Sequence, residues 1–122
     1  MVHVRAKDAV GRYGERVAAR RLTEAGMTVV ERNWRSRRGE IDILARDGDV
    51  LVVCEVKTRR STRAGTAAEA VTPDKLRRLQ DLTEEWLAAH PDVRYAGVRF
   101  DVVAVTPAER GPAHVDHLRG VL

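Results

Sequence analysis

The sequence predicts an α/β fold, with elements in the order α-β-β-β-α-β and a mixed sheet flanked by helices. Two segments, residues 8–25 and 72–90, carry apolar residues at helical spacing. Between them, apolar and polar residues alternate on both sides of Asp47-Gly48, as they do in a β-hairpin. A chain of 122 residues suits one domain with one hydrophobic core, which we expect to span about residues 8–105.

Both helices have recognisable ends in the sequence. Gly26 follows the first helix as a stop signal. In the second helix, Thr72 is the expected N-cap, Pro73 occupies the first turn, and the charge of Asp74 is favourable near the positive end of the helix dipole. The second helix is expected to end before Pro91, and its apolar face consists of Leu76, Leu79, Leu82, Trp86 and Leu87.

The remaining apolar segments are short and suit strands. The expected strands are residues 27–31, 40–46, 49–58 and 98–105. A basic loop, residues 33–39, is expected between the first two strands, and a second basic loop follows the third strand. Residues 106–122 contain several Gly and Pro and are expected to form a loop-like tail with room for one short element.

The composition excludes several classes of protein. Hydrophobic residues make up 43% of the chain and charged residues 33%, which excludes a disordered or membrane-embedded chain. No apolar run approaches the roughly 20 residues that cross a bilayer, and the first residues do not read as a secretory signal. Cys54 is the only cysteine, so no intrachain disulfide can form. We therefore expect a cytoplasmic protein without a membrane partner.

Charge is unevenly distributed along the chain, whose net charge is +4. Residues 1–39 hold ten Lys or Arg against four Asp or Glu, and residues 57–78 hold seven against two. Residues 40–56 reverse the balance, with five acids and one base. Basic surfaces attract phosphate backbones, whereas an acidic cluster among them repels phosphate unless a cation intervenes. An ordinary solvated charged surface explains the counts equally well. The positions of the acids in space therefore decide between this explanation and a nucleic-acid-binding surface.

The hairpin places these acids on one face. If Asp47-Gly48 is a two-residue turn, Arg46 faces Asp49 and Glu40 faces Glu55. One face then carries Glu40, Asp42, Leu44, Leu51, Val53, Glu55 and Lys57, and the other carries Ile41, Ile43, Ala45, Val50, Val52, Cys54 and Val56. The second face is entirely apolar and is expected to be core.

The mixed face gathers groups that suit a metal site. Asp42 and Glu55 are expected as diagonal neighbours, near enough for both carboxylates to bind one ion. Glu40 opposite Glu55 is a destabilising like-charge pair, which either a cation or Lys57 alone would relieve. Carboxylate oxygens are ligands for Mg²⁺ or Mn²⁺, and a neighbouring lysine suits the activation of water or the stabilisation of a charged transition state.

Several strings along the chain resemble a known nuclease family. These are GEIDIL at residues 39–44, EVKTR at residues 55–59, Gly14-Glu15, ERNWR at residues 31–35, EAVT at residues 69–72 and RFDVV at residues 99–103. Together they resemble the PD-(D/E)XK nuclease signature, and most closely the YraN-like family of small bacterial proteins, which is distantly similar to archaeal Holliday junction resolvases. The resemblance covers about residues 11–105, with Ile41 in place of the motif's Pro.

The resemblance implies a restriction-endonuclease-like core and a role for each site residue. Asp42 and Glu55 would be metal ligands, Lys57 the catalytic lysine, and Glu15 an additional acid from the first helix; Glu40 is a further acid nearby. The implied cofactor is Mg²⁺ or Mn²⁺. The implied activity is metal-dependent hydrolysis of DNA phosphodiester bonds, with branched recombination or repair intermediates as the implied substrates. Symmetric cutting of both strands of a junction would require a homodimer.

Arginines flank the acids on both sides and are candidates for phosphate contacts. These are Arg35, Arg37, Arg38, Arg59, Arg60 and Arg63. Lys75 and its helical neighbours Arg77 and Arg78 are better explained as a solvated helix face. The competing hypothesis is a non-catalytic nucleic-acid-binding or adaptor module that keeps the nuclease fold. A purely structural module would leave the basic segments and opposed acids unexplained.

Two further sets of residues have ordinary explanations. Trp34 could stack on a base, but a tryptophan that packs in the core or anchors a loop is the preferred interpretation. His114 and His117, with Asp116 between them, resemble a metal cluster only superficially, because a zinc site needs more ligands within reach.

Overall fold

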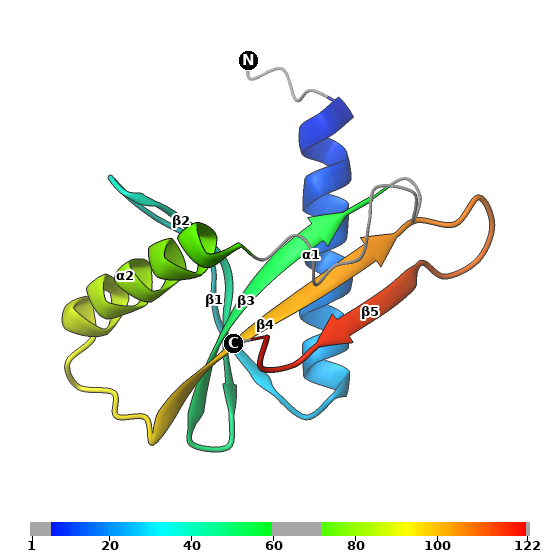
Figure 1. The fold of residues 1–122 in the computed structure, drawn as a ribbon. Helices are drawn as coiled ribbons and strands as arrows, with labels where there is room; N and C mark the ends of the chain where they lie inside the picture. The colour runs from blue at the N-terminus through cyan, green and yellow to red at the C-terminus, as the bar shows by residue number, and fades with distance from the viewer. Residues whose placement is uncertain (1–5, 60–71, 122) are drawn as a thin grey trace, which may run out of the picture.

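The computed structural model describes residues 6–59 and 72–121, which form a five-stranded sheet and two helices (Figure 1). The strands lie in the order β1-β2-β3-β4-β5; β3 and β4 are parallel and the other neighbours are antiparallel. The elements are α1 (Ala6–Glu24), β1 (Thr28–Ser36), β2 (Gly39–Asp47), β3 (Val50–Thr58), α2 (Pro73–Ala89), β4 (Gly97–Thr106) and β5 (His114–Leu118). The predicted α/β fold and element order are confirmed, with β5 added.

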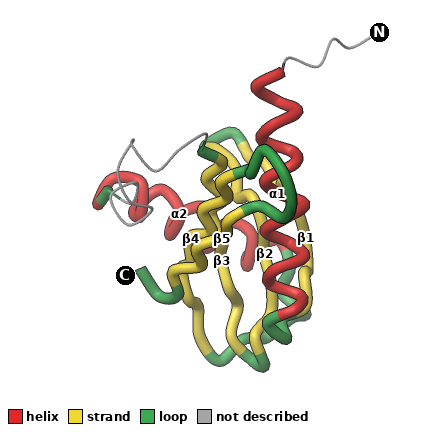
Figure 2. Tube along the Cα trace, turned by 90° about the vertical axis from the view of Figure 1, so that its right-hand side faces the viewer, coloured by secondary structure: helices red, strands yellow, loops and turns green. Residues whose placement is uncertain are grey.

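The sheet lies between the two helices, so each face has its own apolar cluster (Figure 2). On the α1 side, Ala18 and Leu22 pack with Ile43, Ala45, Val52, Cys54, Val103 and Val105. On the α2 side, Leu82 and Trp86 pack with Ile41, Leu44, Leu51, Val53 and Phe100. Both faces of the central strands are therefore buried, as expected for strands covered by helices. None of the described helices is long and apolar enough to cross a membrane.

α1 approaches the end of β3 closely, and a glycine makes this possible. A Cβ atom at Gly14 would lie 1.8 Å from Thr58 Oγ1 and 3.0 Å from Thr58 Cβ, so no larger residue fits without a shift. Gly11, one turn earlier, has nothing within 4 Å of such an atom. The contact at Gly14 therefore brings the next residue, Glu15, to the same end of the sheet as Thr58.

α2 begins as the sequence predicts. Thr72 is the N-cap, and its hydroxyl accepts a hydrogen bond from the backbone N–H of Lys75 at 3.2 Å. Pro73 and Asp74 occupy the first turn, and the helix ends at Ala89 with His90 as the C-cap. The predicted apolar face packs on the sheet in full. This cap fixes the direction in which the first turn of α2 meets the sheet.

One loop prediction is wrong, and a second becomes more specific. Residues 33–39 are not a loop, because β1 continues to Ser36 and pairs with β2 up to Ser36–Gly39, leaving Arg37 and Arg38 as a tight turn. Residues 106–122 are not simply a loop-like tail, because β5 pairs with β4. The apolar content of β5 is too low to predict a strand, and the strand forms because β4 supplies a partner edge.

The register of the β2–β3 hairpin is shifted by two residues from the predicted one. Asp47 pairs with Val50, so the two-residue loop is Gly48-Asp49, and the φ of Gly48 is 62°. An even shift does not by itself move side chains to the other face, but it changes the partners. Glu40 therefore does not lie opposite Glu55. The last pair of the hairpin is Ile43 with Cys54, and Asp42 and Glu55 are the next residue on each strand beyond this pair.

The alternation along β2 is broken around Asp42. Ile41 and Ile43, two residues apart, were predicted to share a face, but they pack in clusters on opposite sides of the sheet. Asn33 lies opposite this point, between the pairs Arg32–Ile43 and Trp34–Ile41, and has a φ of 54°. Asn tolerates this left-handed conformation better than most residues. The change of face between Ile41 and Ile43 thus lies opposite the left-handed residue Asn33 of β1.

Candidate active site

Asp42 and Glu55 meet where the β2–β3 pairing ends. The carboxylate of Asp42 accepts a hydrogen bond from the backbone N–H of Val56, with Oδ2 2.8 Å from the nitrogen. The Asp42 side chain thus holds a backbone donor of β3 beyond the last paired residues, Ile43 and Cys54. This interaction fixes Asp42 beside Glu55, the residue before Val56, and brings together the two acids that were predicted as metal ligands.

Two lysines converge on Glu55. Lys57 Nζ lies 3.6 Å from Glu55 Oε1, and Lys75 Nζ lies 2.5 Å from the same oxygen. Lys57 comes from β3, two residues after Glu55, whereas Lys75 comes from the first turn of α2. The sequence interpretation of Lys75 as part of a solvated helix face is therefore wrong. We call Asp42, Glu55, Lys57 and Lys75 the acid–lysine cluster.

The charges of the cluster shift the pKa of Asp42. Burial and the neighbouring carboxylates of Glu55, Glu15 and Glu40 raise this pKa from 3.8 to about 6, although the hydrogen bond from Val56 opposes the shift. Glu15, from α1, thus lies near enough to repel Asp42. Three acids from two strands and a helix act on one carboxylate, which holds its proton more tightly than a solvated aspartate.

The two lysines act on each other. The neighbouring Lys75 ammonium, with burial, lowers the pKa of Lys57, and Glu55 only partly offsets this. Burial tends to lower the pKa of Lys75, but its contact with the Glu55 carboxylate and the negative charge nearby outweigh burial and raise it. Lys57 is therefore the lysine that gives up its proton more readily, which suits a group that interacts with water or a leaving oxygen.

An open pocket of about 630 Å³ lies over the cluster. Asp42, Glu55 and Lys75 line one part of it, and residues of the β1–β2 turn line another. The other lining residues are Arg35, Ser36, Arg37, Arg38, Gly39, Glu40, Arg78 and Leu79. Figure 1 shows this turn projecting beyond the body of the sheet. The pocket therefore has an acidic part next to a wall that carries several guanidinium groups.

The predicted phosphate-binding arginines divide into three sets. Arg35, Arg37 and Arg38 line the pocket, and Arg35 also pairs with Glu40 across the β1–β2 ladder, with Nε and Oε2 3.2 Å apart. The positive charge next to Glu40 is therefore the guanidinium of Arg35, whereas the sequence analysis considered a metal cation or Lys57. Arg59 follows β3, and its N–H donates to Val105 O at 2.8 Å. Arg60 and Arg63 lie outside the described residues.

The donor set suits a hard cation only in part. Asp42 and Glu55 share the site with two nearby acids, Glu15 and Glu40, and crowded carboxylate oxygens are the donors that Mg²⁺ and Mn²⁺ bind. Among residues 6–59 and 72–121, however, no three His, Cys, Asp or Glu side chains are arranged to hold one ion. A two-carboxylate site fits an ion that keeps several waters.

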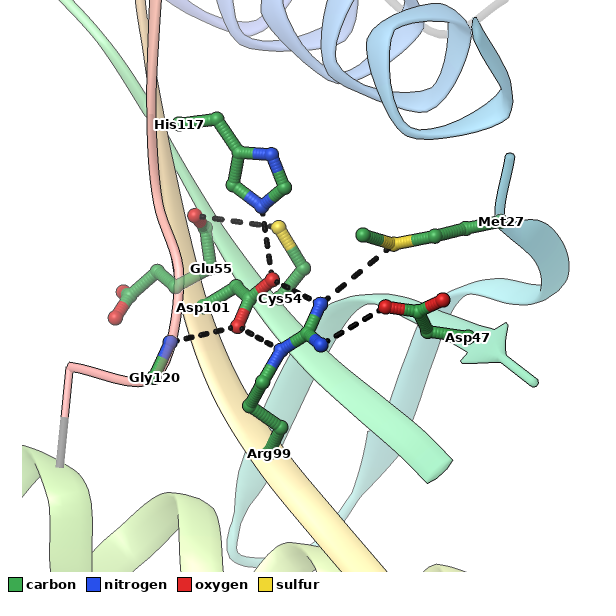
Figure 3. A network of polar contacts seen from close by, with 8 residues as sticks. All are labelled: Met27, Asp47, Cys54, Glu55, Arg99, Asp101, His117 and Gly120. Carbon is green, nitrogen blue, oxygen red and sulfur yellow. Dashed lines mark hydrogen bonds and ion pairs between the residues drawn. The ribbon is translucent and has the colours of Figure 1, made fainter. Parts of the chain in front are cut away.

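A second polar network, which we call the Asp101 network, lies elsewhere on the sheet (Figure 3). Asp101 has a fully buried side chain, and it accepts hydrogen bonds from Arg99 at 2.9 and 3.1 Å, His117 at 2.8 Å and Gly120 N at 3.0 Å. Arg99 also donates to Asp47 at 2.9 Å. The sequence analysis did not identify this network, whose members include Asp47 and Gly120, 73 positions apart.

The histidines and tryptophans have structural surroundings. His117 belongs to the Asp101 network, and His114 pairs with Asp116 at 3.3 Å. Trp86 is buried, and its Nε1 donates to Glu31 at 2.9 Å. Trp34 packs against the α2-side cluster, as expected for an anchoring tryptophan.

Comparison with known proteins gives the family. A model described as "Uncharacterised protein family UPF0102" matches residues 14–105. The chain belongs to the UPF0102 family. A UPF0102 protein of Kineococcus radiotolerans is 76% identical over 121 residues, covering 99% of both chains. UPF0102 proteins of Streptomyces coelicolor and Frankia alni are 60% and 54% identical, covering 95% and 96% of this chain and 90% and 97% of their own. The matched range includes the whole acid–lysine cluster but not β5.

Proposed function

We propose that this UPF0102 protein is a divalent-metal-dependent endonuclease that hydrolyses DNA phosphodiester bonds. One observation carries the proposal: Asp42 and Glu55 line an open pocket whose other wall carries Arg35, Arg37 and Arg38, and Lys57 lies 3.6 Å from Glu55. The raised pKa of Asp42 supports it, because strongly shifted groups in a pocket are typical of functional sites. The resemblance to PD-(D/E)XK nucleases assigns these same residues to catalysis.

The residues have distinct roles in the proposed reaction. When bound by Asp42 and Glu55, Mg²⁺ or Mn²⁺ would withdraw charge from the phosphate and increase the acidity of a coordinated water. Lys57, 3.6 Å from Glu55, lies where it can orient the attacking water or donate to a phosphate oxygen. Glu15 adds negative charge from α1 and so favours the cation. Water attacks phosphorus and gives up a proton, the bond from phosphorus to the leaving oxygen breaks, and the leaving oxygen takes up a proton to become a hydroxyl group.

The basic wall supplies the affinity for the backbone. Arg35, Arg37 and Arg38 stand around the β1–β2 turn, and Arg78 faces the same pocket from α2. Guanidinium groups pair well with phosphate oxygens, and each phosphate neutralised steepens the dependence of affinity on salt. We therefore expect salt-sensitive binding that does not depend on base sequence. The preference for branched DNA, such as recombination or repair intermediates, rests on the likeness to junction resolvases.

A second candidate function also has an observation in its favour. Lys75 lies 2.5 Å from Glu55, so this carboxylate has a positive counter-charge within the protein. A non-catalytic nucleic-acid-binding or adaptor module needs no more than this. The presence of both acids together with Lys57 favours the enzyme, because a binding module has no use for a crowded pair of carboxylates facing phosphate.

A cleavage assay separates the two functions. We would incubate the purified protein with linear, flapped and four-way DNA in Mg²⁺ or Mn²⁺, beside Asp42→Ala, Lys57→Ala and the exposed-acid control Asp81→Ala. We expect cleavage that EDTA abolishes, that both site variants lower at least about a hundredfold, and that the control retains. Binding without cleavage of any substrate would overturn the enzyme and favour the adaptor.

A further inference from the structure

Lys75 is the one member of the acid–lysine cluster that comes from a helix, and its ion pair with Glu55 is the shortest contact in the cluster. It is 20 positions from Glu55 in sequence, and the side chains of both residues are largely buried: 27% of Lys75 and 14% of Glu55 is exposed. The N-cap bond from the Lys75 N–H to Thr72 fixes the backbone from which the side chain extends. An ion pair this sheltered is held in place by the fold, unlike a typical surface pair.

Lys57 and Lys75 share a single oxygen atom. Their Nζ atoms lie 3.6 and 2.5 Å from Glu55 Oε1. Two ammonium groups next to one oxygen repel each other. The single negative charge of Glu55 therefore does not neutralise both lysines. Asp42 and Glu15 add negative charge at the same point. The two lysine charges together match the charge of one divalent cation.

We propose that Lys75 is the resident counter-ion of the metal-free site, and that its ammonium competes with a divalent cation for Glu55. The inference rests on the proposed function in that it takes Asp42 and Glu55 as cation ligands. A cation that binds Glu55 displaces Lys75 from Oε1. Because Arg78 and the arginines of the β1–β2 turn line the same pocket, the freed ammonium joins the basic wall that faces DNA phosphate. Lys75 is thus a positioning residue that couples cation entry to the charge of the DNA-binding pocket.

Mn²⁺ binding in the absence of DNA tests the competition. We would measure the Mn²⁺ affinity of the full chain by titration calorimetry at constant pH, for the natural protein, Lys75→Met, Lys75→Gln and Lys75→Arg. We expect both uncharged variants to bind Mn²⁺ at least about tenfold more tightly, because they remove a cation from Glu55. Lys75→Arg keeps the charge and should bind as the natural protein does. Arg78→Met, which removes a pocket cation that does not pair with Glu55, is the matched control and should change the affinity about twofold at most.

The outcomes distinguish this inference from the proposed function. Mn²⁺ binding by the natural protein that Lys75→Met and Lys75→Gln leave unchanged or weaken overturns the role of Lys75 and leaves the nuclease intact. Binding by the uncharged variants alone supports the role of Lys75 and overturns the nuclease. Absence of Mn²⁺ binding in every variant, with unfolding transitions showing that each is folded, overturns both. An equal increase in Mn²⁺ affinity in Arg78→Met would mean that the loss of any positive charge from the pocket has the same effect. This result would also overturn the role of Lys75.

Discussion

Asp42 on β2 and Asp101 on β4 are two largely buried aspartates of one sheet, and their surroundings shift their pKa values in opposite directions. Burial would raise the pKa of Asp101, but hydrogen bonds from His117, Arg99 and Gly120 outweigh it and lower the pKa to about 2. Asp42 has one backbone donor, and burial with the charges of Glu55, Glu15 and Glu40 raises its pKa to about 6. One carboxylate is satisfied by its protein partners, and the other is repelled by them.

The opposite pKa shifts of the two aspartates distinguish a network that stabilises the fold from a cluster that suits ligand binding. The Asp101 network joins β4, β5 and the β2–β3 turn through Arg99, Asp47 and His117, and Asp101 is fully enclosed. The acid–lysine cluster opens into a pocket and accumulates like charges. A fold that tolerates unfavourable charge at an accessible point does so where a ligand relieves it. This contrast favours the acid–lysine cluster, rather than the histidine-containing network, as the functional site.

The largest effect on stability is expected from Asp101. Asp101→Ala leaves Arg99 charged and partly buried and removes the partner of His117 and Gly120, so we expect a loss of about 3–5 kcal/mol in the free energy of unfolding. Urea denaturation at pH 7 measures it. Asp116→Ala, which breaks an exposed pair with His114, should change stability by about 0.5 kcal/mol at most. Similar losses in the two variants would show that the Asp101 network does not stabilise the fold.

Asp42→Asn is expected to do the opposite. Because the folded-state pKa of Asp42 lies above its unfolded value of 3.8, the natural protein loses stability as the pH rises from about 4 to about 6, and does not regain it above. The neutral amide avoids this loss. Without metal, we expect the variant to be more stable at pH 7.5 by up to about 3 kcal/mol, at 1.36 kcal/mol per pKa unit.

The pH dependence provides the control for this gain. The difference in unfolding free energy between Asp42→Asn and the natural protein should shrink towards zero near pH 4, where the unfolded aspartate is also largely protonated. Asp81→Asn, at an exposed position on α2, should show no such trend. A variant that is less stable than the natural protein at pH 7.5 would mean that Asp42 is stabilised by its neighbours, like Asp101.

Two glycines of α1 test the contact that brings Glu15 to the site. Gly14→Ala places a Cβ against Thr58, and we expect a loss of about 1–3 kcal/mol in unfolding free energy together with weaker DNA cleavage. Gly11→Ala meets nothing within 4 Å and should stabilise the helix by about 0.5–1 kcal/mol. Thermal denaturation of both variants measures the contrast. Equal effects would mean that α1 does not approach β3 at Gly14.

The smallest expected effect concerns the cap of α2. Thr72→Ala removes the acceptor for the Lys75 N–H and should lower stability by about 1 kcal/mol, whereas Thr72→Ser, which keeps the hydroxyl, should have little effect. Chemical denaturation of the two variants checks the difference. A Thr72→Ala protein as stable as Thr72→Ser would show that the first turn, which carries Lys75, is held by other contacts.

Local signals in the sequence predicted most of the fold. The helical spacing of Leu82 and Trp86, the cap at Thr72 and the glycine turn at Gly48 each depend on a few neighbouring residues. β5 was not predicted as a strand, because its stability comes from pairing with β4 rather than from its own composition. The turn was misplaced by one residue because Asp47-Gly48 and Gly48-Asp49 both place a glycine in a two-residue loop.

The candidate site was predictable where it depends on strand alternation. Asp42, Glu55 and Lys57 were identified because an even shift in register leaves their face unchanged. Lys75 was missed because nothing in a helical pattern shows which distant strand residue a side chain will contact. Arg99, Asp101 and His117 were missed for the same reason, since they meet only after β4 and β5 pair with each other.

Unfolding with and without Mn²⁺ tests the central claim most directly, namely that the repulsion at Asp42 and Glu55 serves to bind a divalent cation. We would measure the urea unfolding free energy of the natural protein, Asp42→Asn and Asp81→Asn at pH 7.5, in EDTA and in millimolar Mn²⁺. A cation that binds only the folded state adds stability according to its concentration and affinity. We expect Mn²⁺ to stabilise the natural protein and Asp81→Asn but not Asp42→Asn. Equal stabilisation of all three proteins, or of none, would contradict the account.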